Sequence, residues 1–76
     1  MDLNTFCNID TIVRKYTGAF AIYNRYPDMA LTLECRVTEE DKEHILNELD
    51  LNLPLDTYFS HIYENGELQV IFKEVI

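Results

Sequence analysis

The sequence predicts an α+β fold, in which two helices pack on one face of a four-stranded antiparallel sheet in the order helix, hairpin, helix, hairpin (αββαββ). Three patterns predict it: apolar residues at helical spacing within 5–16 and 38–53, strict alternation over 29–37, and an Asn65-Gly66 turn between two more alternating runs. Helices with one apolar stripe and hairpins with one apolar face bury each other when they form two layers. A chain of 76 residues is expected to make a single compact domain over 1–76.

The first helix is predicted to run from Thr5 to Tyr16. Its apolar residues recur at spacings of three, four and seven, as one face of an amphipathic helix requires: Phe6, Ile9, Ile12, Val13 and Tyr16. Asn4 is expected to cap the first turn, and Gly18 to end the helix in the left-handed conformation.

The first hairpin is predicted from residues 20–25 and 29–37, where apolar and polar residues alternate. Pro27 cannot adopt the positive φ of a two-residue primed turn, so a four-residue loop is expected. Pairing Arg25 with Ala30 then places the apolar side chains of both strands on the same face. That face holds Phe20, Ile22, Leu31, Leu33 and Cys35, while Tyr23, Thr32, Glu34 and Arg36 lie on the other.

The second helix is expected to begin after Thr38, whose hydroxyl can cap it, and to stop before Pro54. The second hairpin turns at Asn65-Gly66, the strongest short-range hairpin signal. Counting outward from that turn pairs Tyr63 with Leu68, His61 with Val70 and Phe59 with Phe72. The predicted core consists of Phe6, Ile9, Ile12, Val13, Ile22, Leu31, Leu33, Ile45, Leu49, Phe59, Val70 and Phe72.

Charge is distributed unevenly along the chain. Residues 1–38 contain four acidic and four basic residues, whereas residues 39–76 contain ten acidic and two basic ones, so the whole net charge of −8 lies in the second half. Such asymmetry indicates either an interaction surface or a solubilising face. Six basic residues against fourteen acidic ones do not supply the cationic footprint that binds phosphates, so direct binding to nucleic acid is not expected.

The segment "TEEDKEHILNELD", residues 38–50, holds six of these acids. The helix dipole favours the three in the first turn, but it does not favour acids nearer the carboxyl end. Acids at the Asn65-Gly66 turn form a like-charge pair that is mildly destabilising. We therefore predict a partner-binding surface that combines these acids with exposed sheet residues: Glu39, Glu40, Glu43, Glu48, Asp50, Glu64, Glu67, Tyr58 and Ile62.

Chemical sites are poorly supported by the sequence. His44 lies one helical turn from Glu40 and from Glu48, a spacing that permits a metal but lacks a second histidine or cysteine to complete the shell. Ser60 and His61 are adjacent in a strand and so point to opposite faces. No glycine-rich phosphate loop is present. We expect no catalytic residue, no metal and no cofactor.

Cys7 and Cys35 lie 28 positions apart, without metal-binding or redox spacing, and both are expected to be buried, reduced thiols. The opening "MDLNTFCNID" lacks the features of a signal peptide, and no apolar run approaches the ~20 residues that span a bilayer. A cytoplasmic location is expected, which means the host cytoplasm if the chain is viral, with no membrane contact.

These observations predict a small acidic inhibitor, not an enzyme, that occupies the basic nucleic-acid-binding surface of a partner enzyme or complex. In size, charge and lack of a catalytic set it is similar in kind to phage anti-restriction and anti-CRISPR proteins and to nuclease immunity proteins. It shares no family motif with them, so no residue role is carried over. The alternative is a regulatory or assembly module that homodimerises through a strand edge or an apolar sheet patch. Both a monomer and a homodimer remain open.

Overall fold

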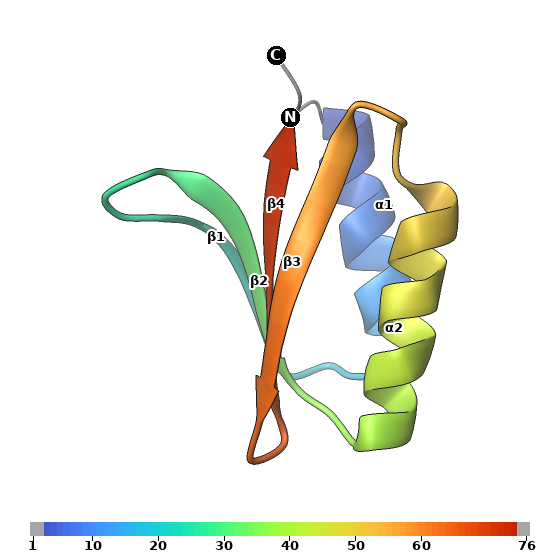
Figure 1. The fold of residues 1–76 in the computed structure, drawn as a ribbon. Helices are drawn as coiled ribbons and strands as arrows, with labels where there is room; N and C mark the ends of the chain where they lie inside the picture. The colour runs from blue at the N-terminus through green and yellow to red at the C-terminus, as the bar shows by residue number, and fades with distance from the viewer. Residues whose placement is uncertain (1–2, 75–76) are drawn as a thin grey trace.

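The computed structural model describes residues 3–74 and contains two helices and a four-stranded antiparallel sheet, which confirms the α+β class (Figure 1). The sheet order is β1-β2-β4-β3, so the two hairpins join through their inner strands. Figure 1 shows both helices on the same side of this sheet. The elements are α1 (Leu3–Arg14), β1 (Phe20–Arg25), β2 (Ala30–Arg36), α2 (Glu39–Asn52), β3 (Thr57–Glu64) and β4 (Glu67–Glu74).

Both predicted hairpin registers are confirmed. Arg25 pairs with Ala30 across the first hairpin, and the loop between them has four residues. In the second hairpin His61 pairs with Val70, and Gly66 has a φ of 82°, which is the conformation that glycine adopts readily. The inner strands then align Leu33 with Val70, so the apolar faces of the two hairpins become continuous.

The first helix begins and ends two residues earlier than predicted, because it spans Leu3–Arg14. Asn4 therefore lies inside the helix, and the prediction that it caps the first turn is wrong. The predicted burial of Phe6 is also wrong, since its side chain is 37% exposed. The buried stripe is centred on Ile9 and includes Thr5, one helical turn earlier, which leaves Phe6 at the margin of the stripe.

The core lies between the helices and the sheet. Eight predicted core residues are buried: Ile9, Ile12, Val13, Leu33, Ile45, Leu49, Val70 and Phe72. Ile22, Leu31 and Phe59 are only partly buried and pack against this cluster. Leu68 and Val37 are buried core residues that the prediction omitted.

The second helix starts as predicted, because the Thr38 side chain accepts a hydrogen bond from the Asp41 backbone N–H at 3.2 Å. Ile45 and Leu49 are its buried residues. At the other end the Leu53 N–H donates to the Leu49 carbonyl at 3.1 Å, and Pro54 follows directly. The helix therefore has one narrow apolar face and a broad solvent-facing one.

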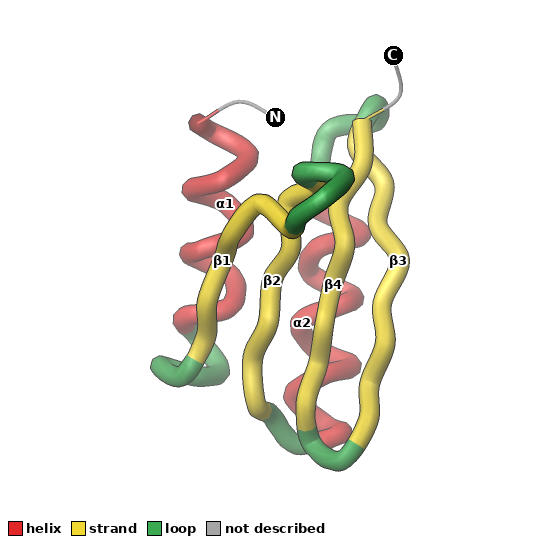
Figure 2. Tube along the Cα trace, turned by 90° about the vertical axis from the view of Figure 1, so that its left-hand side faces the viewer, coloured by secondary structure: helices red, strands yellow, loops and turns green. Residues whose placement is uncertain are grey.

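The sheet leaves one of its faces uncovered by the helices, and we call it the open face. It consists of Ala21, Tyr23, Arg25, Ala30, Thr32, Glu34, Arg36, Tyr58, Ser60, Ile62, Glu64, Glu67, Gln69, Ile71 and Lys73. The tip of the β1–β2 hairpin bends away from the helices, toward this face (Figure 1), and Figure 2 shows the four strands side by side with both helices behind them. Within residues 3–74, none of the helices is long and apolar enough to cross a membrane.

Candidate protein-binding surfaces

The outer face of α2 carries an acidic row, which we define as Glu39, Glu40, Glu43 and Asp50. All four side chains are exposed, on the side of the helix opposite the buried Ile45 and Leu49. From Glu40 to Asp50 the row extends about 15 Å at the helical rise of 1.5 Å per residue. Leu51 lies beside its carboxyl end and is 81% exposed. The row thus combines negative charge with one exposed apolar side chain.

Few local contacts neutralise this row. Lys42 is the one basic residue of α2, and its ammonium lies 2.9 Å from the Glu43 carboxylate and 5.1 Å from the Tyr63 ring centroid. Its attraction holds the pKa of Glu43 below its usual range. The Glu40 carboxylate lies 3.9 Å from the His44 ring nitrogen, a distant contact. Asp50 makes no hydrogen bond or ion pair with the part of the chain that the structure describes.

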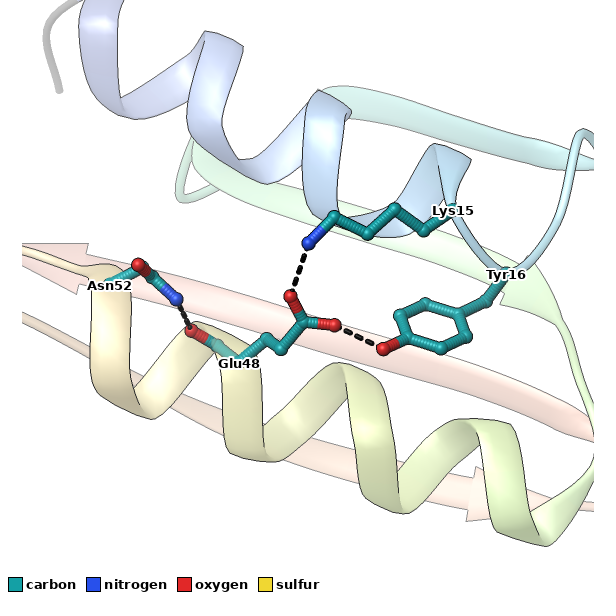
Figure 3. A network of polar contacts seen from close by, with 4 residues as sticks. All are labelled: Lys15, Tyr16, Glu48 and Asn52. Atoms are coloured by element: carbon teal, nitrogen blue, oxygen red, sulfur yellow. Dashed lines mark hydrogen bonds and ion pairs between the residues drawn. The ribbon is translucent and has the colours of Figure 1, made fainter.

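Glu48 belongs to a different structural group, because its carboxylate joins α2 to the two residues that directly follow α1 (Figure 3). The Lys15 ammonium lies 2.5 Å from one carboxylate oxygen, and the Tyr16 hydroxyl donates to the other. The Asn52 side chain donates to the Glu48 backbone carbonyl at 2.7 Å. Glu48, predicted as a partner-binding acid, therefore has a structural role that its position in the helix did not indicate.

The contacts of this network shift the pKa values of Glu48 and Tyr16. Lys15 and then Tyr16 hold the pKa of the Glu48 carboxyl below its usual range, because both stabilise the charged form. The same hydrogen bond raises the pKa of Tyr16. The Tyr16 ring also stacks on His44, with centroids 5.8 Å apart and planes 4° from parallel. His44 therefore contributes a ring contact to the same network, one helical turn before Glu48.

The open face has an apolar centre. Thr32 and Ile71 are cross-strand neighbours on β2 and β4, and both are buried although no helix covers them. Tyr23 on β1 pairs with Thr32, and Ser60 on β3 pairs with Ile71, with Tyr58 and Ile62 two residues to either side of Ser60. Tyr58 is 52% exposed and Ile62 is 54% exposed, so the centre ends in a rim of accessible apolar groups.

The two ends of the open face differ in charge. Glu34, Glu64, Glu67 and Arg36 lie at the end near the Asn65-Gly66 turn, where they line a shallow hollow together with Ile62. Arg36 contacts Glu67 at 2.5 Å and so relieves the predicted repulsion between Glu67 and its cross-strand partner Glu64.

The opposite end of the open face is basic. It carries Lys73 and Arg25, with Arg25 held 2.9 Å from Asp28 in the hairpin loop. The open face therefore runs from a net negative end to a net positive end.

The structure does not bring the nine predicted site residues together. Glu39, Glu40, Glu43 and Asp50 form the row on α2, whereas Tyr58, Ile62, Glu64 and Glu67 lie on the open face, on the other side of the sheet (Figure 1). Glu48 lies between the helices. Two separate surfaces replace the single predicted one, because the helices and the open face lie in different layers of the fold.

Residues considered for chemistry are dispersed. Ser60 faces the open side of the sheet and His61 the helix side, as the register requires, and His61 is exposed at the edge strand. Within residues 3–74, no group of three His, Cys, Asp or Glu side chains is arranged to hold a metal. Cys35 is buried as predicted, but Cys7 is exposed, so its predicted burial is wrong.

Comparison with known proteins gives no relatives: no family model matches the chain, and no curated protein or solved structure matches it either. Function is therefore inferred from the two surfaces alone.

Proposed function

We propose that the protein is a non-catalytic, acidic inhibitor that binds a basic surface on a partner protein, and that the outer face of α2 makes this contact. The partner is a nucleic-acid-binding enzyme or complex, and the acidic row takes the place of the nucleic-acid backbone. The inhibitor acts in the cytoplasm, which is the host cytoplasm if the chain is viral.

The observation that carries this proposal is the acidic row itself. Glu40 and Glu43 lie one turn apart and Asp50 lies two turns further along, all on a face that the core does not use. Asp50 stands near the carboxyl end of the helix, where the dipole disfavours an acid, and the last turn of α2 contains no basic residue to compensate it. Because the fold does not need this charge, a role in recognition accounts for it better than a role in stability.

The row has dimensions that suit mimicry of a nucleic-acid backbone. Its length of about 15 Å equals four to five steps of duplex DNA at about 3.4 Å per step. A cationic groove that binds phosphates would meet carboxylates held on a rigid helix, and long-range attraction would steer the encounter. Leu51, at the end of the row, supplies an apolar contact of the kind found at the centre of protein interfaces.

The test is capture of partners from host lysate by the immobilised chain, followed by mass spectrometry and by competition with duplex DNA and with RNA. We expect a nucleic-acid-binding protein that is retained at low salt and displaced by nucleic acid. Retention should fall as salt increases, because the Debye length drops from about 10 Å at 0.1 M to about 3 Å at 1 M.

Two variant pairs of equal charge locate the contact. Glu43→Gln with Asp50→Asn removes two charges from the acidic row, whereas Glu64→Gln with Glu67→Gln removes two from the open face. We expect the first pair to weaken capture and the second to leave it unchanged. Capture that ignores salt and both pairs would rule out the acidic mimic, and capture lost only with the second pair would move the contact to the open face.

A further inference from the structure

Two ionic side chains of the open face have no ion-pair partner within residues 3–74, and they carry opposite charges. Glu64 lies at the turn end of β3 and Lys73 at the far end of β4, and neither makes an ion pair or hydrogen bond within residues 3–74. The other ionic groups of this face are paired: Arg25 with Asp28, Arg36 with Glu67, and Glu34 with the Tyr23 hydroxyl at 2.6 Å. The unsatisfied charges are thus complementary to each other but too far apart to meet.

The distance between the two charged ends follows from the strand register. Glu67 and Lys73 lie six residues apart on β4, which corresponds to about 20 Å at 3.3 to 3.4 Å per residue. The apolar centre around Ile71 separates them. A surface with an apolar middle, one negative end and one positive end is complementary to an inverted copy of itself.

We propose that the open face is a self-association surface, on which a second copy of this chain packs face to face with its strands reversed. The two-fold axis lies in the plane of the interface and perpendicular to the strands. That axis brings the negative end of each copy over the positive end of the other, so Lys73 of one copy reaches Glu64 and Glu67 of its partner. An axis parallel to the strands would stack like charges on each other.

The shape of the sheet agrees with the reversed arrangement. The β1–β2 hairpin tip bends toward the open-face side (Figure 1) and carries Tyr26 and Met29, which are both exposed. With the strands reversed, the two tips lie at opposite ends of the pair, where each covers the turn end of the other copy. A parallel arrangement would instead place both tips at the same end of the pair and leave both turn ends uncovered.

The area available predicts a weak dimer. Four strands spaced about 4.8 Å apart and about 20 Å long present about 400 Å² per copy. The total of about 800 Å² is below the roughly 1,200 Å² at which stable specific interfaces begin, so we expect a dissociation constant between about 0.1 and 1 mM.

The experiment is sedimentation equilibrium of the purified chain at low and at high salt. Protein concentrations from about 1 μM to 1 mM cover the weak affinity expected of a small interface. We expect a monomer–dimer equilibrium that weakens with salt. Ile62→Asp introduces a charge at the apolar rim and should abolish the dimer. Lys73→Glu should raise the dimer Kd by about tenfold, because two symmetric attractions become repulsions. Adding Glu64→Lys should restore the Kd toward that of the unmodified chain.

Asp50→Lys is the matched control, because it reverses one charge on the outer face of α2 and should leave the dimer unchanged. A monomer at every concentration would overturn the proposal, as would a dimer that survives Ile62→Asp and ignores the Lys73 and Glu64 exchange. Binding of a foreign helix or strand in place of a second copy would show as a monomer that forms a complex sensitive to Ile62→Asp. Capture by the α2 row uses different residues, so either proposal can fail without the other.

Discussion

The role of Glu48 can be recognised only in the folded structure, where its long-range partners are visible. In the sequence it is one more acid in an acidic helix, but in the structure it accepts contacts from Lys15 and Tyr16 at the end of α1. These partners are 33 and 32 residues away along the chain. Helical spacing reports only neighbours three or four residues apart, so it gives no sign of this contact.

Replacing Glu48 with Gln should lower the melting temperature at pH 7 by a few degrees. The folded-state pKa of Glu48 is depressed, so its contribution to the free energy of unfolding is present above the ordinary value of 4.5 and is lost as the pH falls through the folded-state pKa. The difference between the two proteins should therefore narrow below pH 4.5 and disappear in more acidic buffer. Thermal melts of both proteins between pH 2 and pH 8 measure this difference in melting temperature. Asp50→Asn, which removes an acid that makes no ion pair within residues 3–74, should show no such loss.

The two cysteines should differ in reactivity. Cys7 is exposed on α1, whereas Cys35 is buried on the helix side of β2, where burial raises the pKa of its thiol to about 11. The thiolate is the reactive form, so a thiol reagent at neutral pH should modify Cys7 in the folded protein and Cys35 only after unfolding. Mass spectrometry of the modified peptides checks the order. Equal labelling of both thiols in the native protein would contradict the burial of Cys35.

At the scale of elements, α2 has one face that packs in the core and one face that is exposed to solvent. Leu49 should be essential to stability, since its side chain is fully buried between the helices and the sheet. Leu49→Ala is expected to lower the free energy of unfolding by about 2 to 5 kcal/mol, as large-to-small core substitutions do. The control is Leu51→Ala, two residues away on the exposed face, which should change it by less than about 0.5 kcal/mol. Urea denaturation of both variants compares them directly.

The two glycines should respond differently to alanine. Gly66 has a φ of 82°, so a side chain there is strained, although the nearest atom to an added Cβ is Arg36 Nη1 at 3.7 Å. Gly66→Ala should therefore cost about 1 to 2 kcal/mol of stability. Gly18 lies outside the left-handed region, against the prediction, and has no atom within 4 Å of an added Cβ. Gly18→Ala should be neutral or slightly stabilising, because it restricts the unfolded chain. Urea midpoints distinguish the two outcomes.

The hairpins were more predictable from sequence than the helices, for a physical reason. Strand residues alternate strictly, so one correct pair, such as Arg25 with Ala30, fixes the face of every other residue in the hairpin. Helix boundaries depend on caps and on the exact centre of the apolar stripe, which is why Phe6 and Cys7 were misplaced. Burial of Thr32 on the open face also escaped prediction, because it arises from neighbouring strands and not from its own polarity.

At the scale of the whole molecule, the fold separates its two candidate surfaces. The acidic row faces outward from α2, and the open face lies on the opposite side of the sheet (Figure 1). A dimer formed through the open faces would leave both acidic rows on its outer sides. Such a pair would present two binding faces to a partner with repeated cationic sites, and linked contacts of this kind raise overall avidity without new interactions.

Self-association should also make thermal stability depend on protein concentration, because the folded state alone forms the dimer. A hundredfold increase in concentration is expected to raise the melting temperature by about 2 to 5 °C for a domain of this size. Ile62→Asp should remove this dependence, since Ile62 is an exposed rim residue whose replacement disrupts the interface while the core stays intact. Leu51→Asp places the same charge on the exposed outer face of α2, and should leave the dependence in place. Calorimetry of the three proteins at matched concentrations measures the effect. If the melting temperature of the Ile62→Asp protein still rises with concentration, the copies associate through a surface other than the open face.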